Sequence, residues 1–91
     1  MAGEIRFSTQ ATIELDNAIA WYESRQPNLG IEFLEEIENA VSKIAEHPER
    51  FPSEQLPIRH NTLRRFPFTI FYEAEQGMIQ IAAIWHQKRN R

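Results

Sequence analysis

The sequence predicts a single α+β domain in which a helical hairpin packs on a small, mostly antiparallel sheet. Apolar residues recur with a helical period through the first half of the chain and at strand spacing through the second half. Prolines and glycines separate the segments, which gives the order β-α-α-β-β-β. With 91 residues the chain has room for one core, so we expect one domain over residues 1–91.

The first half begins with an alternating segment, residues 4–7, in which Ile5 and Phe7 lie on one side, as in an edge strand. Ser8 or Thr9 can cap a helix that extends to about residue 25. The expected apolar stripe of this helix, with members three or four residues apart, comprises Ala11, Leu15, Ala18, Ile19 and Tyr22.

A second helix is expected over residues 28–46, after a break at residues 27–30 (PNLG). Pro48 ends it, because proline lacks a backbone donor and restricts the residue before it. The short connection predicts an antiparallel hairpin. Its expected apolar stripe comprises Phe33, Leu34, Ile37, Ala40, Val41 and Ile44. The side chains expected to face water are Glu32, Glu35, Glu36 and Glu38.

Three strands are expected in the second half, over residues 57–65, 66–73 and 78–85, and Pro67 delays the start of the middle one. Gly77 suits a hairpin turn between the last two. The last strand is almost continuously apolar, which predicts burial on both faces. Alternation places Ile79, Ile81 and Ala83 on one face and Met78, Ala82 and Ile84 on the other.

Composition excludes several classes of site. The chain has no cysteine, so it has no disulfide, no zinc thiolate and no cysteine nucleophile. None of the histidine pairs has metal-ligand spacing, and we expect neither a metal nor a cofactor. The sequence has no secretory signal and no apolar run long enough to cross a bilayer, so a cytoplasmic protein without membrane contact is expected.

The net charge of −3 conceals an asymmetry: residues 1–54 sum to −7 and residues 55–91 to +4. Strand alternation would place Arg59 and Arg65 on one side and Arg64 on the other. Together with Lys88 and Arg89 they could form one positive patch for a phosphate backbone or an acidic protein segment. The alternative is a set of scattered surface charges.

Two groups could carry chemistry. His86 follows an apolar strand and precedes cations, where it could transfer a proton near neutral pH; the alternative is a surface histidine packed on a neighbouring strand. Phe66, Phe68 and Tyr72 could stack on RNA bases, but their alternation favours a place in the core.

The chain resembles the ParE/RelE superfamily of toxins from bacterial type II toxin–antitoxin systems along nearly its whole length. The resemblance is carried by Ala11-x-x-Glu14-Leu15-x-x-Ala18-Ile19-x-Trp21-Tyr22 in the first helix and Leu29-Gly30-x-x-Phe33-Leu34-x-x-Ile37 in the second. It continues through PERFP at residues 48–52, RRFPFTIFY at residues 64–72 and IWHQKR at residues 84–89. The resemblance implies the same β-α-α-β-β-β fold.

The resemblance implies one of two activities. RelE-like members are ribosome-dependent mRNA endonucleases that use cations, an acid–base group and an arginine before the central strand. Here Thr69 takes the place of that arginine, and residues 51–63 contain no lysine. A nuclease would have to use His86 with Arg65 or Arg89. ParE-like members poison DNA gyrase, and the FPF sequence at residues 66–68 is more similar to theirs.

We therefore favour a ParE-like toxin without a catalytic site of its own. The alternatives are a RelE-like mRNA endonuclease and a degenerate, non-toxic interaction module. All three imply a cognate antitoxin whose tail, a helix plus an extended acidic segment, lies in a groove; candidate contacts are Trp21, Ile31 and Ile58. The tail is expected to be acidic where it meets Arg59, Arg65 and Lys88, and operator DNA is expected to bind only through the antitoxin.

Overall fold

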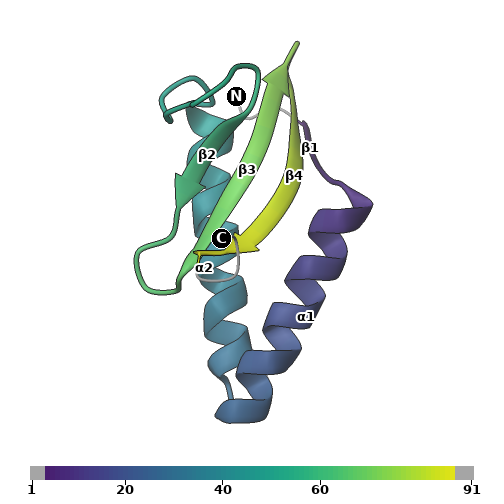
Figure 1. The fold of residues 1–91 in the computed structure, drawn as a ribbon, viewed down its shortest axis with the longest axis vertical. Coiled ribbons are helices and arrows are strands. Elements are labelled where there is room, and N and C mark those ends of the chain that lie inside the picture. The colour runs from purple at the N-terminus through teal and green to yellow at the C-terminus, as the bar shows by residue number, and fades with distance from the viewer. Residues whose placement is uncertain (1–3, 88–91) are drawn as a thin grey trace.

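A computed structural model of the chain describes residues 4–87. The elements, in chain order, are β1 (Glu4–Phe7), α1 (Thr9–Arg25), α2 (Leu29–Glu46), β2 (Arg59–Thr62), β3 (Phe68–Glu75) and β4 (Met78–His86). Figure 1 shows the two helices diverging from their connecting turn, with α2 behind the sheet and α1 along its β1–β4 side. The expected α+β fold and its β-α-α-β-β-β order are confirmed.

The four strands form one sheet in the order β1-β4-β3-β2. β3 pairs antiparallel with both of its neighbours, whereas β1 pairs parallel with β4 at the edge. The sheet is therefore mostly antiparallel, as expected, and the helical hairpin connects its two edge strands, β1 and β2.

Ser8 joins the beginning of α1 to the sheet. Its Oγ caps the helix by accepting from the amide of Ala11 at 2.9 Å and also donates to the carbonyl of Ala82 at 2.8 Å. Of the two residues that could cap α1, the structure selects Ser8 because its hydroxyl satisfies a helix amide and a strand carbonyl at once.

The two helices meet closely at Gly30, which lies in the first turn of α2. A Cβ at this position would be 2.6 Å from the carbonyl oxygen of Ile19 in α1. The chain reverses at Asn28, which adopts a left-handed φ of 73°. The break expected at residues 27–30 is thus made before Gly30, whose lack of a side chain permits the helix contact.

The core lies between the helices and one face of the sheet. β3 contributes Phe68, Ile70 and Tyr72, all at most 3% exposed. Tyr22 and Phe33 of the helices form a ring cluster with Phe66 and Phe68, with centroids 4.9–6.2 Å apart. The aromatics considered for RNA stacking, Phe66, Phe68 and Tyr72, are therefore core residues.

The expectation that β4 is buried on both faces is wrong. The helices cover one face only, and Met78 and Trp85 are exposed on the other. A register irregularity opposite Phe71 and Tyr72 also changes the alternation, so that Ile84 shares the buried face with Ile79 and Ile81. A bulge adds one residue to a strand and thereby reverses the facing of everything that follows it.

The strand expected over residues 57–65 is also shorter, since β2 ends at Thr62. Residues 63–67 form a loop in which the amide of Phe68 donates to the carbonyl of Phe66 at 2.8 Å. The alternation predicted for Arg59, Arg64 and Arg65 therefore does not extend past β2. Among residues 4–87, no helix is long and apolar enough to cross a membrane.

Candidate partner-binding surfaces

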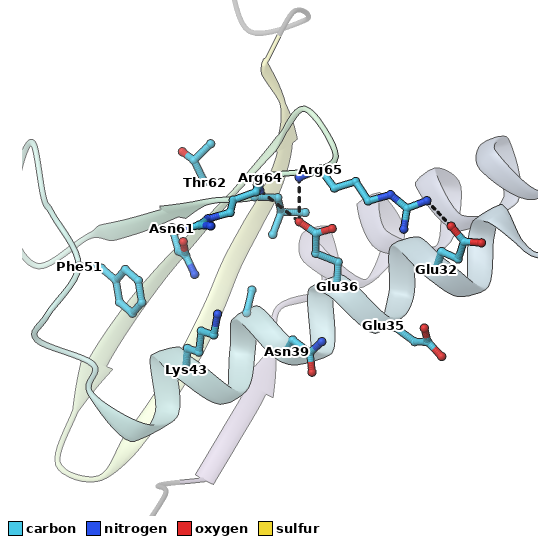
Figure 2. A pocket seen from close by; sticks show the side chains of 12 residues that line it. Glu32, Glu35, Glu36, Asn39, Lys43, Phe51, Asn61, Thr62, Arg64 and Arg65 are labelled. Carbon is cyan, nitrogen blue, oxygen red and sulfur yellow. Dashed lines mark hydrogen bonds and ion pairs between the residues drawn. The ribbon is translucent and has the colours of Figure 1, made fainter.

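A groove of about 510 Å³ separates α2 from β2 and the loop that follows it. Figure 2 shows Glu32, Glu35 and Glu36 along the helix, opposite Arg64 and Arg65. The remaining polar lining consists of Asn39, Lys43, Asn61 and Thr62. Because acids and cations line the same groove, it is a surface of mixed charge.

Two of its glutamates hold the loop of residues 63–67 against the helix. Oε2 of Glu36 accepts from the backbone amides of Arg64 and Arg65 at 3.1 Å each, and Glu32 forms an ion pair with the Arg65 guanidinium (Figure 2). Glu32 and Glu36, which the sequence predicts to face water, are partly exposed, and their carboxylates also accept from donors that the loop provides.

Of the residues expected in a positive patch, the structure brings Arg64 and Arg65 to this groove. Arg59 instead donates through Nη1 to the carbonyl of Phe51 at 2.9 Å. Lys88 and Arg89 lie outside the described residues. A single patch made of all five cations stays a prediction.

Arg59 also affects Tyr72, its register partner on β3. Burial raises the pKa of the Tyr72 hydroxyl, and the nearby guanidinium partly opposes that shift. The hydroxyl donates to the carbonyl of Pro48 at 2.6 Å. A neutral, hydrogen-bonded phenol links the turn after α2 to the sheet and is not available as a base near neutral pH.

His86 lies at the far end of β3 and β4 from that turn, in a hollow of about 350 Å³ against α1. Its ring meets Phe68 edge to face at 5.0 Å, and Trp21 and Tyr22 line the same hollow. The Arg25 guanidinium lies over the exposed Trp21 ring, 4.4 Å from the centroid of that ring. His86 and Trp21 therefore line the same hollow. Arg65, the expected partner of His86 in a nuclease, lines the separate groove beside α2.

Sequence reasoning missed a third surface, on the face of the sheet away from the helices. Phe71 and Trp85 lie there edge to face at 5.3 Å, next to a hollow lined by Leu56, Ile58 and His60. The sequence contains one indication of this surface. Phe71 is an apolar residue between the core residues Ile70 and Tyr72, at a strand position that faces away from the core. No group of three or more possible metal ligands occurs within residues 4–87.

Comparison with known proteins identifies the family. The model of a family described as the ParE toxin of the type II toxin–antitoxin system parDE matches residues 5–91. The chain belongs to the ParE toxin family. Membership implies an antitoxin as partner.

A solved structure supports the same fold for this toxin. The chromosomal ParDE toxin–antitoxin system from P. aeruginosa contains a chain that is 22% identical, with a TM-score of 0.80. The match covers 93% of the toxin and 96% of that chain. No curated protein matches the toxin.

The residues expected to contact the antitoxin occupy different places on the toxin. Trp21 borders the hollow that also contains His86, and Ile31 is exposed near the beginning of α2. Ile58 lines the hollow on the open face of the sheet. An antitoxin tail that contacted all three would have to pass from the helices to the opposite face of the sheet.

Proposed function

We propose that this toxin inhibits DNA gyrase by binding it, and that a cognate antitoxin prevents this. The observation that carries the proposal is the family match over residues 5–91. Gyrase inhibition is typical of the family. The proposal places the toxin's action in the cytoplasm, and operator DNA would be bound only through the antitoxin.

The side-chain arrangement supports inhibition by binding over RNA cleavage. Cleavage through a 2′-OH needs an acid–base group and cations around one phosphate. His86 and Arg65 line different hollows, and the Arg65 guanidinium is paired with Glu32. Thr69, at the position of the nuclease arginine, shares a hydrogen bond of 3.1 Å with the hydroxyl of Thr62.

The proposal also includes the form of the antitoxin contact. The antitoxin would bring a helix and an extended acidic segment to the toxin. Arg64, Arg65 and Lys43 in the α2–β2 groove are the described cations that such a segment could meet. Trp21 is the exposed aromatic anchor that best suits its helix, because the ring borders an apolar hollow.

A supercoiling assay tests the proposed target. Purified toxin, titrated against gyrase and relaxed plasmid, should block supercoiling, and an equimolar amount of antitoxin should restore it. Gyrase that remains fully active at excess toxin would refute the proposal. Primer extension on cellular mRNA after induction, compared for wild type and His86→Ala, would then reveal whether the chain cleaves RNA through His86.

A further inference from the structure

The face of the sheet away from the helices carries a row of rings across three strands. His60 of β2 lies 6.0 Å from Phe71 of β3, and Phe71 lies 5.3 Å from Trp85 of β4. β3 and β4 are the two central strands, so the row crosses the middle of the sheet. Trp85 remains 40% exposed, although most residues on the opposite face of the same strands are buried.

A hydrogen-bonded loop extends this apolar row beyond the sheet. Residues 51–58 are held by hydrogen bonds from the amide of His60 to the carbonyl of Pro52 at 3.0 Å and from the hydroxyl of Ser53 to the carbonyl of Ile58. The loop presents Leu56, which is 64% exposed. Leu56, Pro57, Ile58 and Phe71 enclose a hollow of about 330 Å³ with Glu54 and Gln55 among its lining residues. A preformed apolar hollow with polar lining residues is typical of a protein-docking site.

Charge decides what kind of partner suits this face. Glu73 and Glu75 lie on the same side of β3 as Phe71, and Glu54 borders the hollow. Arg6, the one cation among the strand residues of this face, is paired with Glu4 at 3.0 Å. Over residues 4–87 the face is therefore aromatic and acidic, which disfavours a phosphate backbone and an acidic antitoxin segment.

We propose that this open face, defined by Leu56, Phe71, Trp85, Glu54 and Glu73, docks the toxin's target protein through an apolar anchor flanked by lysine or arginine. The inference rests on the proposed function, because it assigns the target to one face and leaves the helices and the α2–β2 groove to the antitoxin. An apolar side chain would enter the hollow at Leu56. Its cationic neighbours would face the glutamates and the exposed ring of Trp85.

Paired variants test the face. The double variant Leu56→Ser/Trp85→Ala removes the anchor site, and Glu73→Lys reverses a charge beside it. The matched controls are Ile13→Ser and Glu38→Lys, which make similar changes at exposed positions on α1 and α2. Circular dichroism and thermal unfolding establish that each variant is folded, and affinity for purified antitoxin is measured as a separate readout.

We expect the double variant and Glu73→Lys each to require at least about tenfold more toxin for half-inhibition of gyrase, with antitoxin affinity unchanged. The controls should stay within about twofold of wild type. Full potency of the double variant would overturn the inference while leaving the proposed function intact. A folded double variant that loses antitoxin binding would also overturn it, because the face would then belong to the antitoxin.

Growth arrest after induction separates this inference from the proposed target. If wild-type toxin leaves gyrase active yet arrests growth, the proposed function fails, and loss of arrest in the two face variants still supports the docking face. Binding of a fluorescent single-stranded oligonucleotide tests whether a nucleic acid, and not a protein, occupies this face. Binding of that oligonucleotide by wild type, and its loss in Leu56→Ser/Trp85→Ala, would overturn a protein as the occupant of this face.

Discussion

Tyr72 shows how one side chain can connect two distant parts of this small protein. Its ring is fully buried in β3, and its hydroxyl donates to the carbonyl of Pro48 at the end of α2. Replacement by phenylalanine would keep the ring and leave that carbonyl without its donor. We expect Tyr72→Phe to lower the free energy of unfolding by about 1–2 kcal/mol, measured by urea denaturation at pH 7.

The same residue makes stability depend on alkaline pH. Burial raises the pKa of Tyr72 above its ordinary value of 10.0, despite the opposing effect of Arg59, and burial also raises the pKa of Tyr22. A pKa that is higher in the folded state stabilises the protein fully below pH 10, and this contribution is lost as pH rises through the folded-state pKa.

Urea denaturation at pH 8 and pH 11 checks this dependence. Wild type should lose stability between the two values, and Tyr72→Phe should lose less because it lacks one of the two shifted phenols. An equal loss in both proteins would assign the alkaline effect to other groups.

Glu14 closes an exposed edge of β4. β1 ends at Phe7, so the β4 backbone beyond Ile81 lacks a neighbouring strand on that side. The carboxylate of Glu14 accepts from the amide of Ile84 at 2.7 Å, and Ser8, six residues earlier at the N-cap of α1, contacts Ala82. The first turns of α1 therefore satisfy backbone groups that would otherwise invite pairing with another chain.

We expect Glu14→Ala to lower the free energy of unfolding by about 1–3 kcal/mol, because the Ile84 amide loses its acceptor. Glu14→Gln keeps a side-chain oxygen and should cost less. Glu38→Ala, an exposed change on α2, should stay within about 0.5 kcal/mol in the same urea titration. If Glu14→Ala lost no more stability than Glu38→Ala, a water molecule would be accepting from the Ile84 amide in place of the carboxylate.

At the scale of elements, the angle and spacing of the hairpin depend on Gly30. Its amide donates to Oε1 of Glu23 at 2.9 Å, and Oε2 of the same carboxylate accepts from the amide of Asn28 at 2.8 Å. Glu23 of α1 thus caps the beginning of α2, and the absence of a Cβ at Gly30 lets the backbones approach.

Gly30→Ala should therefore separate the helices and lower the free energy of unfolding by about 1–3 kcal/mol, since the obstructing atom is a backbone oxygen. Ser42→Ala, at an exposed position of α2, provides a control that should be neutral or slightly stabilising. Thermal unfolding followed at 222 nm measures both. A neutral Gly30→Ala would mean that the two helices can move apart without loss of core contacts.

At the scale of the whole molecule, the fold separates three surfaces that could act independently. The α2–β2 groove has mixed charge, the hollow beside α1 contains Trp21 and His86, and the open sheet face is aromatic and acidic. Toxicity and neutralisation can therefore be altered by different substitutions.

Antitoxin binding should also stabilise the fold by mass action. A ligand that binds only the folded state adds about 2.7 kcal/mol at a hundred times its dissociation constant. We expect the melting temperature of the toxin to rise continuously with antitoxin concentration. Trp21→Ala should reduce that rise without lowering the melting temperature of the toxin alone by more than a few degrees, because the ring is half exposed. An unchanged rise in Trp21→Ala would exclude this residue as an antitoxin contact.

The sequence by itself determined the elements, their order and most of the core. Helical and strand periods are local, so the stripe containing Ile37 and Ile44 and the turn at Gly77 were readable without knowledge of the partner elements. The family was equally readable, because its motifs extend along the whole chain.

Only the tertiary structure decided which side chains meet. The bulge that turns Ile84 inward, the acceptance of the Arg64 and Arg65 amides by Glu36, and the position of Trp85 beside Phe71 all depend on register or on contacts between distant segments. A shift of one residue moves a side chain to the opposite face of a sheet, and local periodicity does not specify that shift.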